Sequence, residues 1–195
     1  MENHLRKDHW CGCMIRSYAL FRVFESMSQT KHPESMTVIA KRAGVGLTSA
    51  KRVVDYLADY RLVKRTPLGR MILCELDRDN VLVRHLKASL SLGRIHEVGL
   101  IEELLKKNPA ILSVILFGSV ARGTDMPDSD VDIVIISRSN VSFNGLKSEK
   151  VLDREVSWMQ FTPSQWKVKA RDDKAFYDNV VIGGIAIHGE IPVVR

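Results

Sequence analysis

Cysteine is scarce in this chain. Its 195 residues contain only 3 cysteines, an odd number that does not suggest a disulfide framework. His9, Cys11 and Cys13 lie close together near the start, a grouping that would suit zinc, although zinc usually takes four ligands. The remaining cysteine, Cys74, is far along the chain. We therefore expect reduced, structurally incidental cysteines, with a metal site near the N-terminus as the alternative.

Long apolar segments are also lacking. No stretch approaches the roughly 20 apolar residues that a membrane-spanning helix needs. The opening segment MENHLRKDHWCGC contains no apolar core of a secretory signal. With 45% hydrophobic and 27% charged residues, the composition is typical of globular proteins. We expect a cytoplasmic protein without membrane contact, in which residues 1–14 form a partly ordered N-terminus.

The net charge of +6 is distributed unevenly. Residues 1–95 carry 17 lysine and arginine side chains against 9 acidic ones, whereas residues 96–195 carry 12 against 14. Such asymmetry suggests a half that faces nucleic acid beside a half with a different task. Basic, solvated helix faces would produce the same imbalance.

The basic half contains a helix-turn-helix pattern. An amphipathic helix is expected from Ile15, followed by helices over 36–43 and 47–60 that are joined by a turn with two glycines. Thr48 or Ser49 is a candidate cap for the second of these helices. Two apolar runs separated by a turn at 66–69 then predict a hairpin. Residues 15–78 resemble the winged helix-turn-helix family on this pattern.

If this segment docks as that family does, the helix over 47–60 would enter the major groove of DNA. The resemblance then implies two groups of contacts, from the start of this helix and from the hairpin. The candidate nucleic-acid-binding residues are Thr48, Ser49, Lys51, Arg52, Lys64, Arg65 and Arg70. Phosphate contacts of this kind provide affinity without sequence choice. A protein-interaction or dimerisation module is the alternative for this domain.

Two helices are expected between the halves. The first, over 79–93, would act as a linker helix (79–94), with Asn80 as its cap and Gly93 as a break. The second, over 94–108, would end at Asn108-Pro109 and open a second domain over 95–195. The fold class expected for the whole chain is therefore α+β.

The densest chemistry lies in LFGSVARGTDMPDSDVDIVII, residues 116–136. Apolar runs at 111–117 and 131–136 predict two buried strands. Gly118 would allow a sharp bend after the first strand, and Ser119 would begin a helical turn that can hold an anion. Asp130 and Asp132 would point to one face of the second strand, where two carboxylates repel each other unless a cation lies between them. Mg²⁺ suits such ligands and commonly bridges them to nucleotide phosphates.

The sequences GSVARG and SDVDIVII resemble the polymerase-β-type nucleotidyltransferases, and more narrowly the minimal nucleotidyltransferase domains. The resemblance covers about residues 95–192 and implies a small mixed sheet flanked by helices, Mg²⁺ and a nucleoside triphosphate. Gly118 and Ser119 match the triphosphate-binding pair of the family, and Asp130 and Asp132 match its metal ligands. A nucleotidyl group would pass to a hydroxyl, with two metal ions stabilising the attacking and leaving oxygens. Arg122 would either contact phosphate or pair with Asp125.

The third carboxylate of the family falls at Ser157 in this sequence, on a strand expected over 155–161 after a helical segment over 143–154. Glu155, two residues earlier on the same face, is the candidate that would replace it; otherwise the site has two carboxylates. Trp158 and Trp166 are interpreted as core residues rather than base-stacking platforms, and His188 as structural rather than close to the nucleotide.

The leading hypothesis is an Mg²⁺-dependent nucleotidyltransferase with an unknown acceptor and a DNA-binding winged helix. A homodimer and a complex with a partner protein both remain open for this protein. The alternative is a DNA-binding regulator or antitoxin-like protein whose second domain only binds nucleotide or is inactive.

Overall fold

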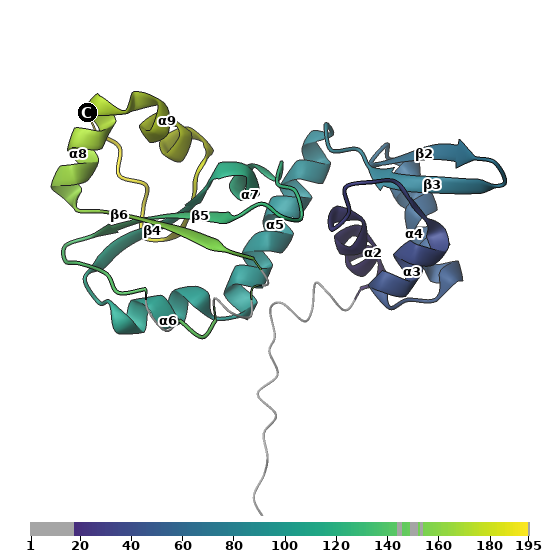
Figure 1. Cartoon of the computed structure of the whole chain (residues 1–195), viewed down its shortest axis with the longest axis horizontal. Coiled ribbons are helices and arrows are strands. Elements are labelled where there is room, and N and C mark those ends of the chain that lie inside the picture. The colour runs from purple at the N-terminus through teal and green to yellow at the C-terminus, as the bar shows by residue number, and fades with distance from the viewer. Residues whose placement is uncertain (1–17, 144–145, 149–151, 153, 195) are drawn as a thin grey trace, which may run out of the picture. The chain divides into compact units, whose positions relative to one another are not determined.

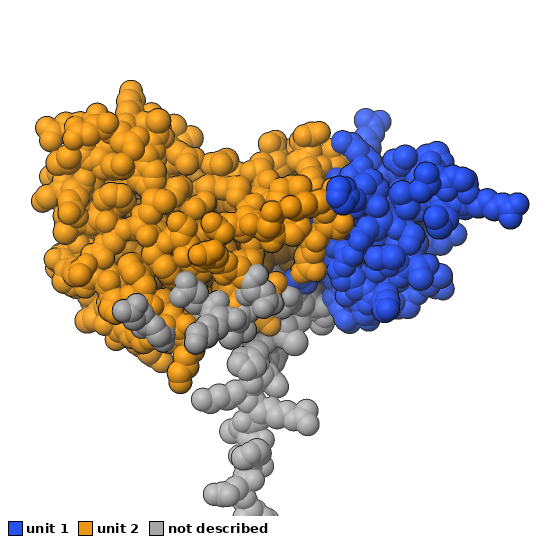
Figure 2. Space-filling view, in the orientation of Figure 1, with its two compact units in different colours: residues 1–28, 32–76 blue, residues 29–31, 77–195 orange. Residues whose placement is uncertain are grey.

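A computed structural model describes residues 18–143, 146–148, 152 and 154–194. The chain divides into two compact units (Figure 2). Unit 1 comprises residues 1–28 and 32–76, and unit 2 comprises residues 29–31 and 77–195. The first expected helix began at Ile15, which lies outside the described residues together with His9, Cys11 and Cys13.

Unit 1 contains three helices and a small sheet among its described residues (Figure 1). The helices are α2 (Ala19–Ser28), α3 (Met36–Ala43) and α4 (Leu47–Asp59), and the strands are β1 (Glu34–Ser35), β2 (Val63–Leu68) and β3 (Met71–Leu76). The strands pair antiparallel in the order β1-β3-β2. The predicted helix pair and hairpin are thus present, with Gly44 in the left-handed conformation at the end of α3.

Two local predictions in unit 1 were wrong. The cap of α4 is Gly46, so Thr48 and Ser49 lie inside the first turn of the helix. The hairpin turns at Gly69 and Arg70 rather than at 66–69, because Pro67 lies within β2 opposite Ile72. Proline is tolerated there since β2 is an edge strand, where a missing N–H disturbs no ladder.

Unit 2 begins with α5 (Val81–Glu97) and α6 (Leu100–Lys107). Asn80 caps α5 as expected, accepting a hydrogen bond from the Leu82 backbone N at 2.9 Å. The predicted break at Gly93 was wrong, because α5 continues through this residue and ends before Gly99. A glycine inside a helix costs only about 1 kcal/mol relative to alanine, which the packing of a long helix readily offsets.

The sheet of unit 2 has the order β6-β5-β4-β7. Its strands are β4 (Ile111–Phe117), β5 (Val131–Ser137), β6 (Val156–Phe161) and β7 (Ile185–His188). β5 pairs antiparallel with β4 and parallel with β6, so the sheet is mixed, as the family resemblance implies. The expected helix over 143–154 was wrong for its described residues, because Leu146, Lys147, Ser148, Leu152 and Arg154 lie in turns, bends or coil.

Helices cover both faces of this sheet (Figure 1). One face packs on α5 and α6 through a core that includes Ile95, Leu104, Leu116 and Ile133. The other face packs on α8 (Pro163–Asp172) and α9 (Lys174–Gly183). Trp166 is 1% exposed in that second core, and Trp158 stacks on Phe143, so both tryptophans are packing residues as expected. In the described part of the chain, no helix is long and apolar enough to cross a membrane.

Candidate functional site

The bend after β4 brings the backbone of Gly118 against the side chain of Asp132. Gly118 has a φ of 73°, a conformation that L side chains rarely adopt. A Cβ atom at this position would lie 2.2 Å from Oδ2 of Asp132. Phe117 is the register partner of Asp132 in the antiparallel β4–β5 pair, which explains why the next residue meets this carboxylate. The bend and the aspartate therefore converge, and only glycine fits between them.

Asp130 and Asp132 lie at the start of β5. Alternation along the strand places Asp132 on the face of Val134 and Ile136, which pack toward α8 and α9. Asp132 is half-buried and Asp130 is exposed. Burial raises the pKa of Asp132, the nearby charge of Asp130 raises it further, and Arg122 opposes both. This pair is therefore close enough to repel in the absence of a cation.

The donor set at this point suits a hard cation. Two carboxylates that disfavour each other's charge offer the oxygen ligands that Mg²⁺ prefers. Among the described residues, however, no group of three or more His, Cys, Asp or Glu side chains is arranged to hold a metal ion. Asp130 and Asp132 would thus be the protein ligands of such an ion, with other ligands coming from nucleotide and water.

Ser157 on β6 is the direct register partner of Asp132. A side chain at this position belongs to the same face of the sheet, and it is a hydroxyl rather than a third carboxylate. Glu155 lies one residue before β6 and is exposed, while its backbone O accepts a hydrogen bond from the Val131 N at 2.9 Å. The structure therefore anchors the Glu155 backbone beside the aspartate pair and leaves its side chain in solvent.

Arg122 ends α7 (Gly118–Arg122), the short helix that Ser119 and the bend begin. Its Nη1 donates a hydrogen bond to Oδ1 of Asn179 on α9 at 2.6 Å. The alternative in which Arg122 pairs with Asp125 was wrong, since the carboxylate of Asp125 is paired with Lys87 and Arg154. Arg122 is instead close enough to Asp132 to lower its pKa.

The second glycine of GSVARG has a packing role. Gly123 has a φ of 66°, and a Cβ there would lie 1.8 Å from the backbone O of Arg84 on α5. α7 therefore lies directly against α5. The two glycines of the motif make different close contacts: Gly118 lies against the Asp132 carboxylate, and Gly123 lies against the α5 backbone. His188 is half-buried on β7 as the register partner of Val114, within the sheet and away from the β4 end that carries the bend.

In unit 1, the candidate nucleic-acid-binding residues are all exposed. Thr48, Ser49, Lys51 and Arg52 lie on the first half of α4, and Lys64, Arg65 and Arg70 lie on the hairpin. Arg65 is paired with Asp55 on α4, which partly neutralises its charge.

Comparison with known proteins adds one finding to this geometry. Residues 98–179 match the model of the nucleotidyltransferase domain family. This segment contains both aspartates, the bend, Arg122 and Asn179, and the match supports a nucleotidyltransferase domain in unit 2. No protein of curated function gives a significant match.

One similar solved structure is described as a toxin-antitoxin with AMP-PNP. It is 24% identical, with 48% of this chain and 73% of that chain covered and a TM-score of 0.35.

Proposed function

We propose that unit 2 transfers a nucleoside monophosphate from a nucleoside triphosphate to an acceptor hydroxyl. The observation that carries this proposal is the contact between Gly118 and the Asp132 carboxylate, which joins an anion-binding bend to an acidic pair. The reaction breaks the bond between the α-phosphorus and the oxygen that bridges it to the β-phosphorus, and it forms a bond from the α-phosphorus to the acceptor oxygen. The acceptor hydroxyl loses its proton to solvent, and pyrophosphate leaves.

Each residue has a distinct part in this scheme. Asp130 and Asp132 would hold Mg²⁺, which when bound would neutralise charge on the triphosphate and on the leaving pyrophosphate. The Ser119 hydroxyl and the backbone N–H groups at the start of α7 bind phosphate oxygens. Arg122, whose Nη1 donates to Asn179, provides a positive charge near the same phosphate oxygens. Glu155 is the candidate third acid; its side chain is exposed in the structure and would have to turn toward the aspartate pair to join the site.

Unit 1 has a separate role in this proposal, as a winged helix that binds DNA. The support is the order of its elements, with α3 and α4 joined by a left-handed glycine and followed by the β2–β3 hairpin. The exposed basic residues of α4 and the hairpin are suited to phosphate contacts. Such a unit would bring the transferase to DNA, or to a protein bound there.

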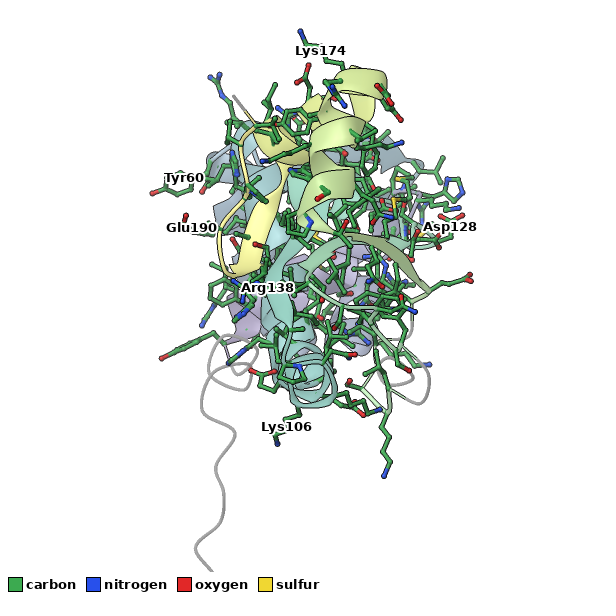
Figure 3. The ribbon with its side chains drawn as sticks, turned by 90° about the vertical axis from the view of Figure 1, so that its left-hand side faces the viewer. Tyr60, Lys106, Asp128, Arg138, Lys174 and Glu190 are labelled. Atoms are coloured by element: carbon green, nitrogen blue, oxygen red, sulfur yellow. The ribbon has the colours of Figure 1, made fainter. Side chains whose placement is uncertain are left out.

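A transfer assay tests the main proposal. The protein is incubated with Mg²⁺, a cell extract and each of ATP, CTP, GTP and UTP labelled at the α-phosphate, and with γ-labelled ATP in parallel. Nucleotidyl transfer attaches the α-label and not the γ-label to an acceptor. Asp132→Asn should abolish the labelling, whereas Asp128→Asn, an exposed acid in the same loop (Figure 3), should preserve it. Labelling that survives Asp132→Asn would exclude this site.

A second candidate function is nucleotide sensing without turnover, as in a regulator. Ser157 favours it, because a hydroxyl stands in register with Asp132 where a third acid is expected. Serine is a weak metal ligand and no strong base. Nucleotide binding that depends on Mg²⁺ and on Asp132, with no transfer to any acceptor, would support sensing over catalysis.

A further inference from the structure

Arg154 binds the loop before Asp130 through all three nitrogen atoms of its guanidinium group. Nε donates to the backbone O of Ser129 at 2.8 Å, and Nη2 donates to the backbone O of Met126 at 3.1 Å. Nη1 pairs with Oδ2 of Asp125 at 3.1 Å. One side chain thus holds three points of the segment 125–129, which is the planar, multidentate binding that arginine provides and lysine does not.

The other side of the loop is held by Lys87 on α5. Its Nζ lies 2.6 Å from the backbone O of Asp125 and 3.1 Å from Oδ1 of the same residue. Lys87 is 5% exposed and Asp125 is 6% exposed, so both charges are buried. Burial lowers the pKa of Lys87, and Asp125 opposes this shift. Asp125 is therefore a buried anion held between two cations, with both carboxylate oxygens in ion pairs.

The backbone of Asp130 is fixed on both sides as a result. The residue before it, Ser129, is bound by Arg154, and the residue after it, Val131, donates its N–H to the backbone O of Glu155. The loop is closed internally as well, because Met126 N donates to Ser129 Oγ at 2.8 Å and Ser129 N donates to Met126 O at 2.9 Å. Two consecutive residues, Arg154 and Glu155, therefore hold the backbone on either side of Asp130, the first residue of the aspartate pair.

A buried ion network of this kind contributes little stability compared with a well-packed apolar cluster. Its measurable effect is instead on the position of the loop before Asp130. Outer groups that orient metal ligands typically change metal affinity by about 10-fold to 100-fold when they are removed. Asp130 is exposed, and the residues on either side of it are held by hydrogen bonds to Arg154 and Glu155.

We propose that Arg154, together with the Lys87–Asp125 pair, is a positioning residue that places the Asp130 carboxylate beside Asp132 for cation binding. This inference rests on the proposed function, since it takes the aspartate pair to be the cation site. Arg154 contacts neither nucleotide nor ion in this scheme and acts through the backbone of Ser129.

The test measures binding of α,β-methylene-ATP to the full chain, with Mn²⁺ and with EDTA. Arg154→Lys keeps the charge but removes the three-point contact. We expect it to lower the Mn²⁺-dependent affinity about tenfold and to leave the affinity in EDTA unchanged. Asn108→Ala is the matched control, because Asn108 is buried and holds another loop through two hydrogen bonds to the Ser142 backbone. It should lower the melting temperature but leave the Mn²⁺ effect, the difference between nucleotide affinity in Mn²⁺ and in EDTA, unchanged.

The possible outcomes separate the two proposals. If Arg154→Lys lowers only the melting temperature, as the control does, Arg154 is structural and the inference is overturned while the proposed function stands. If Asp132→Asn also leaves the Mn²⁺ effect intact, the cation site itself is excluded. Asp125→Asn, which preserves side-chain volume, should show a smaller loss of the same kind. It decides the question if Arg154→Lys does not fold.

Discussion

Asp132 and Ser157 are register partners on the adjacent parallel strands β5 and β6. Their side chains belong to the same face of the sheet, at the end where α7 begins. A carboxylate in place of the Ser157 hydroxyl would therefore face the Asp130–Asp132 pair directly. This position therefore determines whether a third acid lies in direct register with Asp132.

Ser157→Asp should make the stability of unit 2 depend strongly on Mg²⁺. Without metal, a third carboxylate in register with Asp132 adds like-charge repulsion, because like charges directly opposite each other on neighbouring strands are destabilising. With Mg²⁺, the same side chain becomes a ligand, and transfer activity should rise. Melting temperatures of the wild type, Ser157→Asp and the uncharged control Ser157→Asn, with and without Mg²⁺, measure this. An equal response of both variants to Mg²⁺ would contradict a cation site next to position 157.

Gly118→Ala should disrupt both the fold near the bend and the site. The new Cβ would overlap Oδ2 of Asp132, and the φ of 73° would cost a further 1–2 kcal/mol or so for an L residue. We expect a loss of stability of a few kcal/mol in urea unfolding, together with loss of nucleotide binding. Gly93→Ala is the control, since a Cβ there meets nothing within 4 Å and alanine favours the interior of α5 by about 0.5–1 kcal/mol. A Gly118→Ala protein as stable as Gly93→Ala would refute the contact.

The strands and the bend could be predicted from the sequence because their signals are local. β4 and β5 are mostly apolar, with only Ser113 in the first and Asp132 and Ser137 in the second as polar residues, and Gly118 follows β4 directly. The observed β4 has the predicted bounds, and β5 differs by one residue. The parallel register of β5 and β6 then places Ser157 where the family pattern expected a third acid.

The loop network could not be predicted, because its members are far apart in the sequence. Lys87 and Asp125 are separated by 38 positions, and Asp125 and Arg154 by 29. No periodicity joins them, and each alone looks like a surface charge. Gly93 and Pro67 were misjudged for a different reason: both residues commonly mark turns, and here tertiary packing and an edge-strand position override that local preference.

Asp132→Asn should stabilise the metal-free protein at neutral pH. The folded-state pKa of Asp132 is raised, so its contribution to stability is present below the unfolded value of about 3.9 and is lost as pH rises through the folded pKa. Asparagine mimics the protonated form and removes this loss. Urea unfolding in EDTA should show the variant more stable than the wild type near pH 7 and equal to it near pH 3. A wild type that is the more stable of the two near pH 7 would contradict the raised pKa.

Glu103 should show the opposite dependence on pH. The hydroxyl and backbone N of Ser148 and the backbone N of Lys147 donate to its carboxylate and lower its pKa to about 2. A lowered pKa means that the contribution is present above the unfolded value and is lost as pH falls toward about 2. Glu103→Gln should therefore destabilise the protein at neutral pH, with the difference shrinking in acid. Glu102→Gln on the same helix, whose side chain is 54% exposed, should have little effect at either pH.

Lys51→Ala tests the proposed role of unit 1 in DNA binding. Lys51 is exposed on the first half of α4, and a lysine that meets a phosphate releases about one counterion on binding. The slope of log affinity against log salt concentration should therefore fall by about one. Arg65→Ala should change it less, because Asp55 already pairs with Arg65. Lys174→Ala, on α9 of unit 2 (Figure 3), should leave it unchanged. If Lys51→Ala and Lys174→Ala give the same slope, Lys51 meets no phosphate. If the wild type does not bind duplex DNA at all, the exposed face of α4 is better explained as a protein contact.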